Sequence, residues 1–267
     1  MNKFELLQKY KNSEDRILIS KILDKIKFCE TRNKITYTNF LDLRQQAIAK
    51  KLLSSIKTTN YIFYGGFDNA ERTCLIFYPQ KFDSDFVLNK IDAIIKNVNI
   101  MLPKELHNTY SHRNYLGGIM KLGIQREKVG DILVRDNGAN ILVCNDIANS
   151  LTNLLASLTR FKKSEILVES IRNINVPEIN KEEVTIIVPS LRLDSIVSSL
   201  AHTSRNKALE IILNERVLVN FETCTKSSKT LSYGDIVTIR GKGRFEINCL
   251  KSTSKAGNLI VTVYKYV

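Results

Sequence analysis

Apolar residues recur at helical spacing in the first part of the chain. Ile19, Ile22 and Ile26 fall on one helical face, and Ser13 followed by two acidic residues is typical of a helix start. The same spacing predicts a second helix over residues 41–56, with basic side chains on its polar side. The chain therefore begins with two amphipathic helices.

Two strands are expected next. Aromatic and β-branched residues cluster at residues 61–64 and 73–78, on either side of a loop that contains Gly65-Gly66. Together with the two helices, this pair of strands predicts a first domain at residues 1–82.

From residue 84 the order of the predicted elements changes. The expected order is strand 87–95, helix 115–122, strand 131–135, a turn at Asn137-Gly138, strand 139–144, helix 147–158 and strand 165–171. This βαββαβ order predicts a ferredoxin-like domain at residues 83–176, a layout shared by many RNA-recognition domains.

Two features of this predicted domain affect its interpretation. The first strand also fits a helix, because Ile91, Ile94 and Ile95 have helical spacing. Residues 131–135 contain no aromatic residue, so we do not expect RNA bases to stack on the sheet.

A linker is predicted at residues 172–185, which contain Pro177 and the acidic pair Glu182-Glu183. Beyond it, two short helices lead into a strand at residues 217–220. The chain is thus expected to be an α+β, multidomain protein, with its third domain, linker included, at residues 177–267.

Positive charge is concentrated at the two ends of the chain. The net charge of +13 divides into +7 over residues 1–57, zero over residues 58–183 and +6 over residues 184–267. Basic segments of this kind either form solvated helical faces or bind a polyanion, and charge alone leaves both possibilities open.

Composition excludes several other classes of protein. No stretch has the roughly 18 apolar residues of a membrane helix, and the polar start lacks the apolar run of a signal peptide, so we expect a cytoplasmic protein. No coiled-coil pattern is present, and we expect a monomer. The cysteines lack metal-ligand or redox spacing and are expected to be reduced and mostly buried: Cys29, Cys74, Cys144, Cys224 and Cys249.

The most specific pattern lies in the last third of the chain. It consists of Ser-Leu-Arg-Leu-Asp at residues 190–194, Ser-Arg-Asn-Lys-Ala at residues 204–208, Val-Leu-Val-Asn at residues 217–220, Lys229, Gly234-Asp235, and Arg240-Gly241-Lys242-Gly243-Arg244. This pattern resembles the small RNA-binding domain first recognised in the fourth protein of the small ribosomal subunit. The resemblance implies that a helix beginning near Ser204 presents Arg205 and Lys207 to a phosphate backbone.

The residues themselves support this interpretation. Ser204 can cap a helix whose first amide groups attract phosphate, and nearby cations add charge-assisted hydrogen bonds to the same anion. Asp194 suggests either the nucleophile of a pseudouridine synthase or, as we expect, a partner for a nearby cation or a helix cap. The predicted RNA-contact residues are Arg192, Ser204, Arg205, Asn206, Lys207, Lys229, Arg240, Lys242 and Arg244.

Three further blocks lie upstream. They are Thr-Asn-Phe-Leu-Asp at residues 38–42; Gly65-Gly66-Phe67 followed by Ala-Glu-Arg at residues 70–72; and Tyr-Leu-Gly-Gly-Ile-Met-Lys-Leu-Gly-Ile at residues 115–124, followed by Arg126 and Gly-Asp-Ile at residues 130–132. With the C-terminal pattern they resemble the bacterial YlmH family over nearly the whole chain. Leu43 stands where the family usually has proline, and Asn114 replaces a frequent acidic residue.

The resemblance implies a ribosome-associated factor. Its expected partners are ribosomal RNA of the large subunit, peptidyl-tRNA and the factor that adds an alanine tail to a stalled nascent chain. Some members of the family are linked to cell division by gene context. The resemblance implies that this factor acts by position, without catalysis or a cofactor.

Two enzyme-related patterns are weak. The glycine pairs lack the context of a nucleotide-binding loop, and His107 and His112 have no marked nucleophile beside them. An RNA-modifying enzyme such as a pseudouridine synthase, or a regulator of messenger RNA or cell division, remains the alternative. For Gly117-Gly118, close helix packing and contact with an RNA backbone both remain open.

Overall fold

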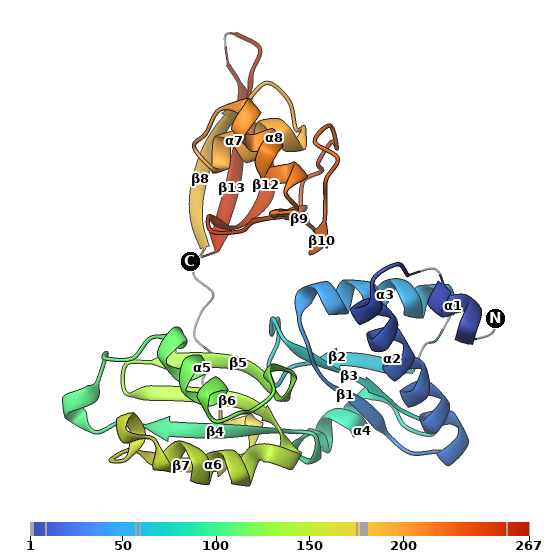
Figure 1. Ribbon diagram of the computed structural model, residues 1–267, viewed down its shortest axis with the longest axis vertical. Coiled ribbons are helices and arrows are strands. Elements are labelled where there is room, and N and C mark those ends of the chain that lie inside the picture. The colour runs from blue at the N-terminus through green and yellow to red at the C-terminus, as the bar shows by residue number, and fades with distance from the viewer. Residues whose placement is uncertain are drawn as a thin grey trace. The chain divides into compact units, whose positions relative to one another are not determined.

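A computed structural model describes residues 3–8, 10–56, 58, 60–174, 176, 181–254 and 256–266. The chain divides into two compact units, residues 1–177 (the N-terminal unit) and residues 178–267 (the C-terminal unit) (Figure 1). Both units combine helices with antiparallel sheets, which confirms the α+β class. The predicted boundary between residues 82 and 83 falls inside the N-terminal unit and stays a prediction.

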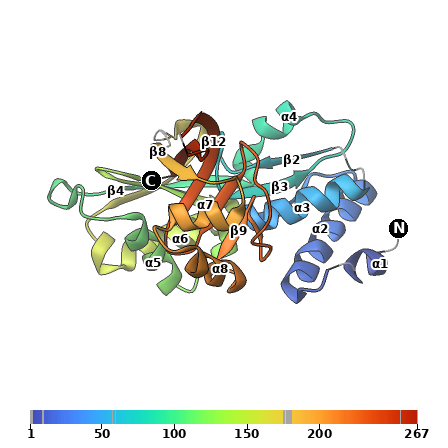
Figure 2. The ribbon, with the colours of Figure 1, turned by 90° about the horizontal axis from the view of Figure 1, so that it is seen from above.

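The first part of the N-terminal unit is a three-stranded antiparallel sheet, in the order β1-β3-β2, with helices on one face. Figure 2 shows α2 and α3 side by side. Apolar side chains from both helices pack against Leu75 and Phe77 of the sheet. The elements are α1 (Lys3–Gln8), α2 (Ser13–Arg32), β1 (Thr36–Leu41), α3 (Leu43–Ile56), β2 (Tyr61–Tyr64) and β3 (Thr73–Phe77).

Both predicted helices and both predicted strands of this part are present, with three corrections. The cap of α2 is Asn12, whose Oδ1 accepts from the backbone N–H of Glu14 at 2.8 Å, and Ser13 is the first helical residue. Strand β1 was not predicted, and α3 starts later than expected. Asp42 separates the two elements, because its Oδ1 accepts from the N–H of Gln45 at 2.8 Å and thereby caps α3.

The second part of the N-terminal unit is a four-stranded antiparallel sheet in the order β5-β6-β4-β7. Helices α5 and α6 cover one face, where Tyr115, Ile119, Leu151 and Leu155 are buried. The predicted βαββαβ order is confirmed. The elements are α4 (Ser84–Asn89), η1 (Ile91–Ala93), β4 (Ile95–Met101), η2 (Lys104–Leu106), α5 (His112–Lys121), η3 (Arg126–Lys128), β5 (Val129–Arg135), β6 (Gly138–Cys144), η4 (Asn145–Ile147), α6 (Ala148–Ser157), η5 (Thr159–Phe161), β7 (Glu165–Glu169) and η6 (Ile171–Asn173).

The first strand of this sheet was placed wrongly. Residues 87–95 contain the second half of α4, then η1, and the strand β4 begins only at Ile95. Asp83 starts α4, since its Oδ1 accepts from the N–H of Phe86 at 2.7 Å. The helix α4 thus ends before Ile91, Ile94 and Ile95, whose helical spacing had suggested a helix, and Ile95 is the first residue of the strand.

The C-terminal unit is a six-stranded sheet in the order β10-β9-β11-β12-β13-β8. Helices α7 and α8 lie on one face of it (Figure 1), and Ile196, Ala208 and Ile212 belong to their shared core with the sheet. The elements are β8 (Lys181–Val188), α7 (Leu193–Leu200), α8 (Arg205–Leu213), β9 (Val217–Val219), β10 (Glu222–Thr223), β11 (Ile236–Ile239), β12 (Gly243–Thr253) and β13 (Leu259–Tyr266).

The predicted pair of short helices followed by a strand is confirmed, but the predicted linker is partly wrong. Glu182 and Glu183 belong to β8 and pair with Lys265 and Tyr264 of β13. Alternating apolar residues after them face the core, which makes this segment a strand. Of the predicted linker, residues 175 and 177–180 lie outside the described residues.

Among the described residues, no helix has both the length and the apolar character needed to cross a membrane.

Candidate RNA interface

A buried carboxylate orients two of the predicted RNA-contact arginines. Asp194, in the first turn of α7, has a side chain that is 3% exposed, whereas those of Arg192 and Arg205 are 40% and 55% exposed. Arg192 donates from Nε and Nη2 at 3.1 and 2.9 Å, and Arg205 donates from the same two atoms at 3.2 and 2.8 Å. Each guanidinium thus has one edge on the carboxylate.

These bonds keep Asp194 charged. The hydrogen bond from Arg192 holds the pKa of Asp194 well below its usual range, and the bonds from Arg205 and the N–H of Ser195 act in the same direction, against the effect of burial. The expectation that Asp194 pairs with a nearby cation is confirmed. A carboxylate occupied by two arginines is poorly placed to act as a nucleophile.

The start of α8 lies beside this ion cluster. Ser204 caps the helix, since its Oγ accepts from the N–H of Lys207 at 3.3 Å, and the predicted cap is confirmed. Arg205, Asn206 and Lys207 are exposed in the first turn. Lys207 pairs with Glu210 at 3.0 Å, but both side chains are more than 60% exposed, so this ion pair is weak.

Lys229 belongs to the same region. Its carbonyl accepts from the N–H of Leu193 at 2.8 Å, which places the backbone of Lys229 next to the start of α7. The structure therefore brings together Arg192, Ser204, Arg205, Asn206, Lys207 and Lys229, which we call the α8-start cluster.

The remaining predicted cations lie elsewhere. Arg240 and Lys242 occupy the turn between β11 and β12, where Gly241 and Gly243 have φ angles of +82° and +125°. Arg216, which follows α8, joins them: its carbonyl accepts from the N–H of Arg240 at 2.9 Å, and its Nη2 donates to the Arg240 carbonyl at 3.3 Å. Arg216 was not predicted as a contact residue.

Arg216, Arg240 and Lys242, which we call the turn cluster, are separated from the α8-start cluster by the helix itself. Helix α8 has 9 residues, which corresponds to a length of roughly 13 Å. The two clusters therefore do not form a single anion site.

Arg244 belongs to neither cluster. It lies in β12, is half-buried, and places its guanidinium 5.6 Å from the ring centre of Phe221 and 5.5 Å from that of Tyr266. Packing on two rings is a structural role for this side chain.

The upstream sequence blocks meet at the junction of the two sheets in the N-terminal unit. Asp131 accepts from the N–H groups of Glu71 and Arg72 at 2.7 and 3.1 Å. Arg72 in turn donates from Nε to the carbonyl of Val129 at 3.0 Å and from Nη2 to that of Phe40 at 3.2 Å. These residues tie the first sheet to the second.

Two glycines of these blocks permit the close approach. A Cβ at Gly130 would lie 2.6 Å from Cε1 of Phe40, and one at Gly66, whose φ is +108°, would lie 2.5 Å from Cδ1 of Leu142. Burial raises the pKa of Asp131 to about 6 and lowers that of Arg126 to about 10. This set of groups has a structural explanation, since it holds two sheets together.

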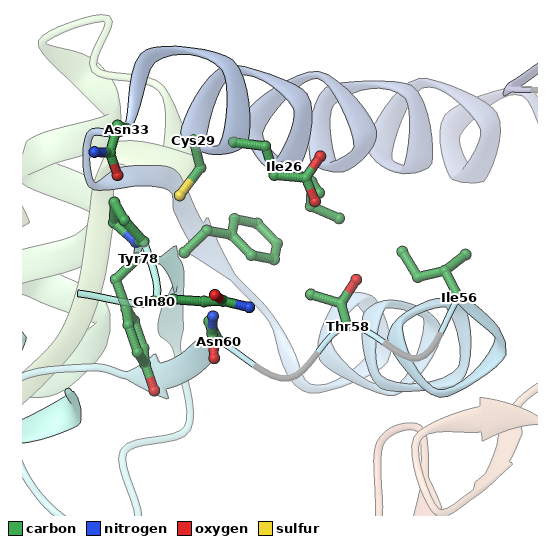
Figure 3. A pocket seen from close by; sticks show the side chains of 11 residues that line it. Ile26, Cys29, Asn33, Ile56, Thr58, Asn60, Tyr78 and Gln80 are labelled. Carbon is green, nitrogen blue, oxygen red and sulfur yellow. The ribbon is translucent and has the colours of Figure 1, made fainter. Parts of the chain in front are cut away.

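A cavity of about 470 Å³ lies at one end of the first sheet (Figure 3). Cys29 and Glu30 line it together with amide side chains, including Asn33 and Gln80, and the described part of its lining contains no histidine, lysine or arginine. Burial, and then the charge of Glu30, raise the pKa of the Cys29 thiol. The thiol therefore stays protonated at neutral pH.

Other candidates for chemistry are also engaged elsewhere or isolated. His107 Nε2 lies 3.3 Å from the carbonyl of Leu102, and burial followed by the charge of Arg126 lowers the pKa of His112. Cys29, Cys74 and Cys144 are buried, as expected, whereas Cys224 is half-buried and Cys249 is exposed. Within the described part of the chain, no group of His, Cys, Asp and Glu side chains could hold a metal ion.

Two family models match the chain. The model described as the putative RNA-binding domain in YlmH matches residues 89–175, and the S4 domain model matches residues 191–237. The first range covers the four-stranded sheet and its helices, and the second runs from the start of α7 into β11. The chain thus contains a YlmH-type RNA-binding domain followed by an S4 domain, the combination that its resemblance to the YlmH family implies.

Individual relatives were also found. The chain is 28% identical over 254 residues to the ribosome-associated protein quality control protein P2 of Bacillus subtilis, covering 93% of this chain and 94% of that protein. A solved structure, described as cell division protein ylmH from Streptococcus pneumoniae, matches with a TM-score of 0.47 at 20% identity, covering 62% of this chain and 98% of that one.

Proposed function

We propose that this protein is a non-catalytic RNA-binding factor that binds the large ribosomal subunit while peptidyl-tRNA is still attached. By holding the peptidyl-tRNA in place, it would allow a tailing factor to add alanines to the stalled nascent chain. Such a factor acts in the cytoplasm. The name of the Bacillus subtilis relative, which aligns with nearly the whole chain, supports a role of this kind.

The observation that carries the proposal is the α8-start cluster. Its two arginines are oriented on a buried carboxylate, and Lys207 and the first amide groups of α8 lie in the adjacent turn. Guanidinium groups held in fixed positions lose little entropy when they bind phosphate, and a helix start adds a partial positive charge. This arrangement suits contact with an RNA backbone without requiring any reaction.

A binding measurement tests the proposal. Purified large ribosomal subunits are titrated with three proteins at several salt concentrations. These are the wild-type full chain, its Lys207→Ala variant and its double variant, which combines Lys207→Ala with Arg205→Ala. We expect the double variant to bind at least about tenfold more weakly, and each lost phosphate contact to reduce the salt dependence by roughly one unit of slope.

The design needs a control because Arg205 also binds Asp194. Lys251→Gln removes an exposed cation from β12 of the same unit and should bind normally. Thermal melts establish that each variant is folded. Wild-type protein that sediments apart from large subunits, or a folded double variant that binds as the control does, would contradict the proposal. Base modification of RNA transcripts by the purified protein would favour the enzyme instead.

A further inference from the structure

The two adjacent glycines of α5 have different surroundings. A Cβ at Gly118 would make ordinary van der Waals contact with Cδ1 of Leu158 at 3.4 Å and Cε2 of Phe161 at 3.5 Å, so Gly118 faces η5 and the segment before it. At Gly117 a Cβ would meet nothing within 4 Å. A glycine within a helix costs roughly 0.5–1 kcal/mol relative to alanine, and packing within the chain does not account for the one at Gly117.

Cations surround this open position. Arg113, Gly117 and Lys121 are four residues apart along α5 and therefore lie on one face of the helix, and both cations are exposed. Arg160 reaches the same helix, since its Nη1 donates to the carbonyl of Asn114 at 2.8 Å. We call Arg113, Gly117, Lys121 and Arg160 the α5 surface.

Residues 58–183 have no net charge, but their charged side chains are unevenly distributed along the chain. Residues 106–126 and 147–164, which contain α5 and α6, include no Asp or Glu and six Lys or Arg: Arg113, Lys121, Arg126, Arg160, Lys162 and Lys163. The acidic residues of the middle region lie outside these two segments. The two segments that contain α5 and α6 therefore carry a net positive charge.

The opposite face of this sheet offers little to RNA. There Glu169 accepts from Nδ2 of Asn99 at 3.0 Å, and Nη2 of Arg135 donates to Oδ1 of Asn99 at 2.6 Å. A carboxylate engages the amides of this face, and the guanidinium of Arg135 is already bound to one of them.

We propose that the α5 surface is a second RNA-binding surface, which grips phosphates with Arg113, Lys121 and Arg160 and allows the RNA backbone close to the helix at Gly117. This inference rests on the proposed function and extends it to the N-terminal unit. Exposed cations on one helix face match a polyanion, and a missing side chain lets a sugar-phosphate backbone approach between the cations.

Two kinds of variant of the full chain test the α5 surface. Arg113→Gln with Lys121→Gln removes two charges, and Gly117→Gln adds an uncharged side chain at the open position. The matched control is Lys81→Gln with Lys90→Gln, which removes two exposed cations elsewhere in the same unit. The probes are purified large ribosomal subunits and the deproteinised ribosomal RNA extracted from them.

We expect the α5 charge variant to bind both probes at least about tenfold more weakly, with a salt slope smaller by roughly one to two. Gly117→Gln should also weaken binding while leaving the melting temperature unchanged or higher, because glutamine favours a helix more than glycine does. A purely structural role for Gly117 would not produce that combination.

Three results would overturn the inference: affinities equal to those of the control, an unchanged salt slope, or weakened binding to subunits with normal binding to deproteinised RNA. The last result would indicate a protein partner. If the wild-type chain failed to bind large subunits, the proposed function would fall, and the deproteinised RNA would still decide whether the α5 surface binds RNA.

Discussion

Asp194 connects the stability of the C-terminal unit to its RNA-binding surface. The carboxylate is buried, but both arginines that bind it are partly exposed. If the side chain of Asp194 were neutral, Arg192 and Arg205 would lose the carboxylate that fixes their orientation. The buried side chain at position 194 would in turn lose its ion pairs with the two arginines. Removing one member of a buried ion pair is costly because the other partners are left unpaired.

We expect Asp194→Asn to lower the free energy of unfolding of the C-terminal unit by about 2 kcal/mol. This is less than for a fully buried ion pair, because the two arginines are partly exposed to water. The pKa of Asp194 is depressed in the folded state, so its contribution is present above the unfolded value of about 3.9 and is lost as the pH falls below it.

Denaturant unfolding at pH 7 and pH 3 checks this prediction. The difference between wild type and Asp194→Asn should be large at pH 7 and smaller at pH 3. Equal stability at pH 7 would mean that the arginines do not need this carboxylate.

At the scale of residues, the sequence predicted what depends on near neighbours. The cap at Ser204 and the pairing of Asp194 involve groups three and two residues away in the chain. The position of Arg244 could not be predicted, because its two aromatic neighbours, Phe221 and Tyr266, come from distant segments. Arg216 was missed for the same reason, since only the fold places it beside Arg240.

At the scale of elements, the junction of the two sheets in the N-terminal unit depends on Asp131. This carboxylate accepts two backbone N–H groups from the segment before β3, yet burial raises its pKa to about 6. Since the unfolded value is about 3.9, the folded state binds more protons between pH 4 and pH 6. Stability therefore decreases as the pH rises through this window.

We expect the wild-type N-terminal unit to lose about 2 kcal/mol of stability from this group between pH 4 and pH 6, and Asp131→Asn to remove that dependence. The variant should also be about 1 kcal/mol less stable at pH 5, because an amide can accept only one of the two N–H bonds. The exposed Asp136→Asn is the control, and urea unfolding across this pH range is the measurement. A pH dependence identical in all three proteins would be inconsistent with the raised pKa.

The errors in predicting elements have a common origin. Helices with strong periodicity and the strands β2, β3, β5, β6 and β7 were found, because their residues carry the pattern themselves. Strand β1 and strand β8, which contains two glutamates, were missed because only pairing with β3 and β13 makes these segments strands. The segment after residue 82 had two competing patterns, and the cap at Asp83 favoured the helix.

At the scale of the whole molecule, the hydrophobic clusters define which parts depend on each other. One cluster contains Phe40, Cys74 and Ile76 from the first sheet and Ile95 and Leu142 from the second. The two sheets of the N-terminal unit therefore share a core. The core of the C-terminal unit is built only from residues of that unit.

This difference predicts the behaviour of fragments. Residues 1–177 and residues 178–267, expressed separately, should each unfold cooperatively, because each fragment keeps its own core.

Fragment 178–267 should bind deproteinised ribosomal RNA with a smaller salt slope than the full chain, since it lacks the α5 surface. Fragment 1–177 should bind this RNA more weakly than either the full chain or fragment 178–267. Connecting the two surfaces in one chain raises the effective concentration of the second after the first has bound. The full chain should therefore bind RNA more tightly than the fragment with the higher affinity does. In the α5 charge variant of the full chain, this gain in affinity should be lost. If fragment 178–267 matched the full chain in both affinity and salt slope, the N-terminal unit would make no contact with RNA, and its α5 surface would need a different partner.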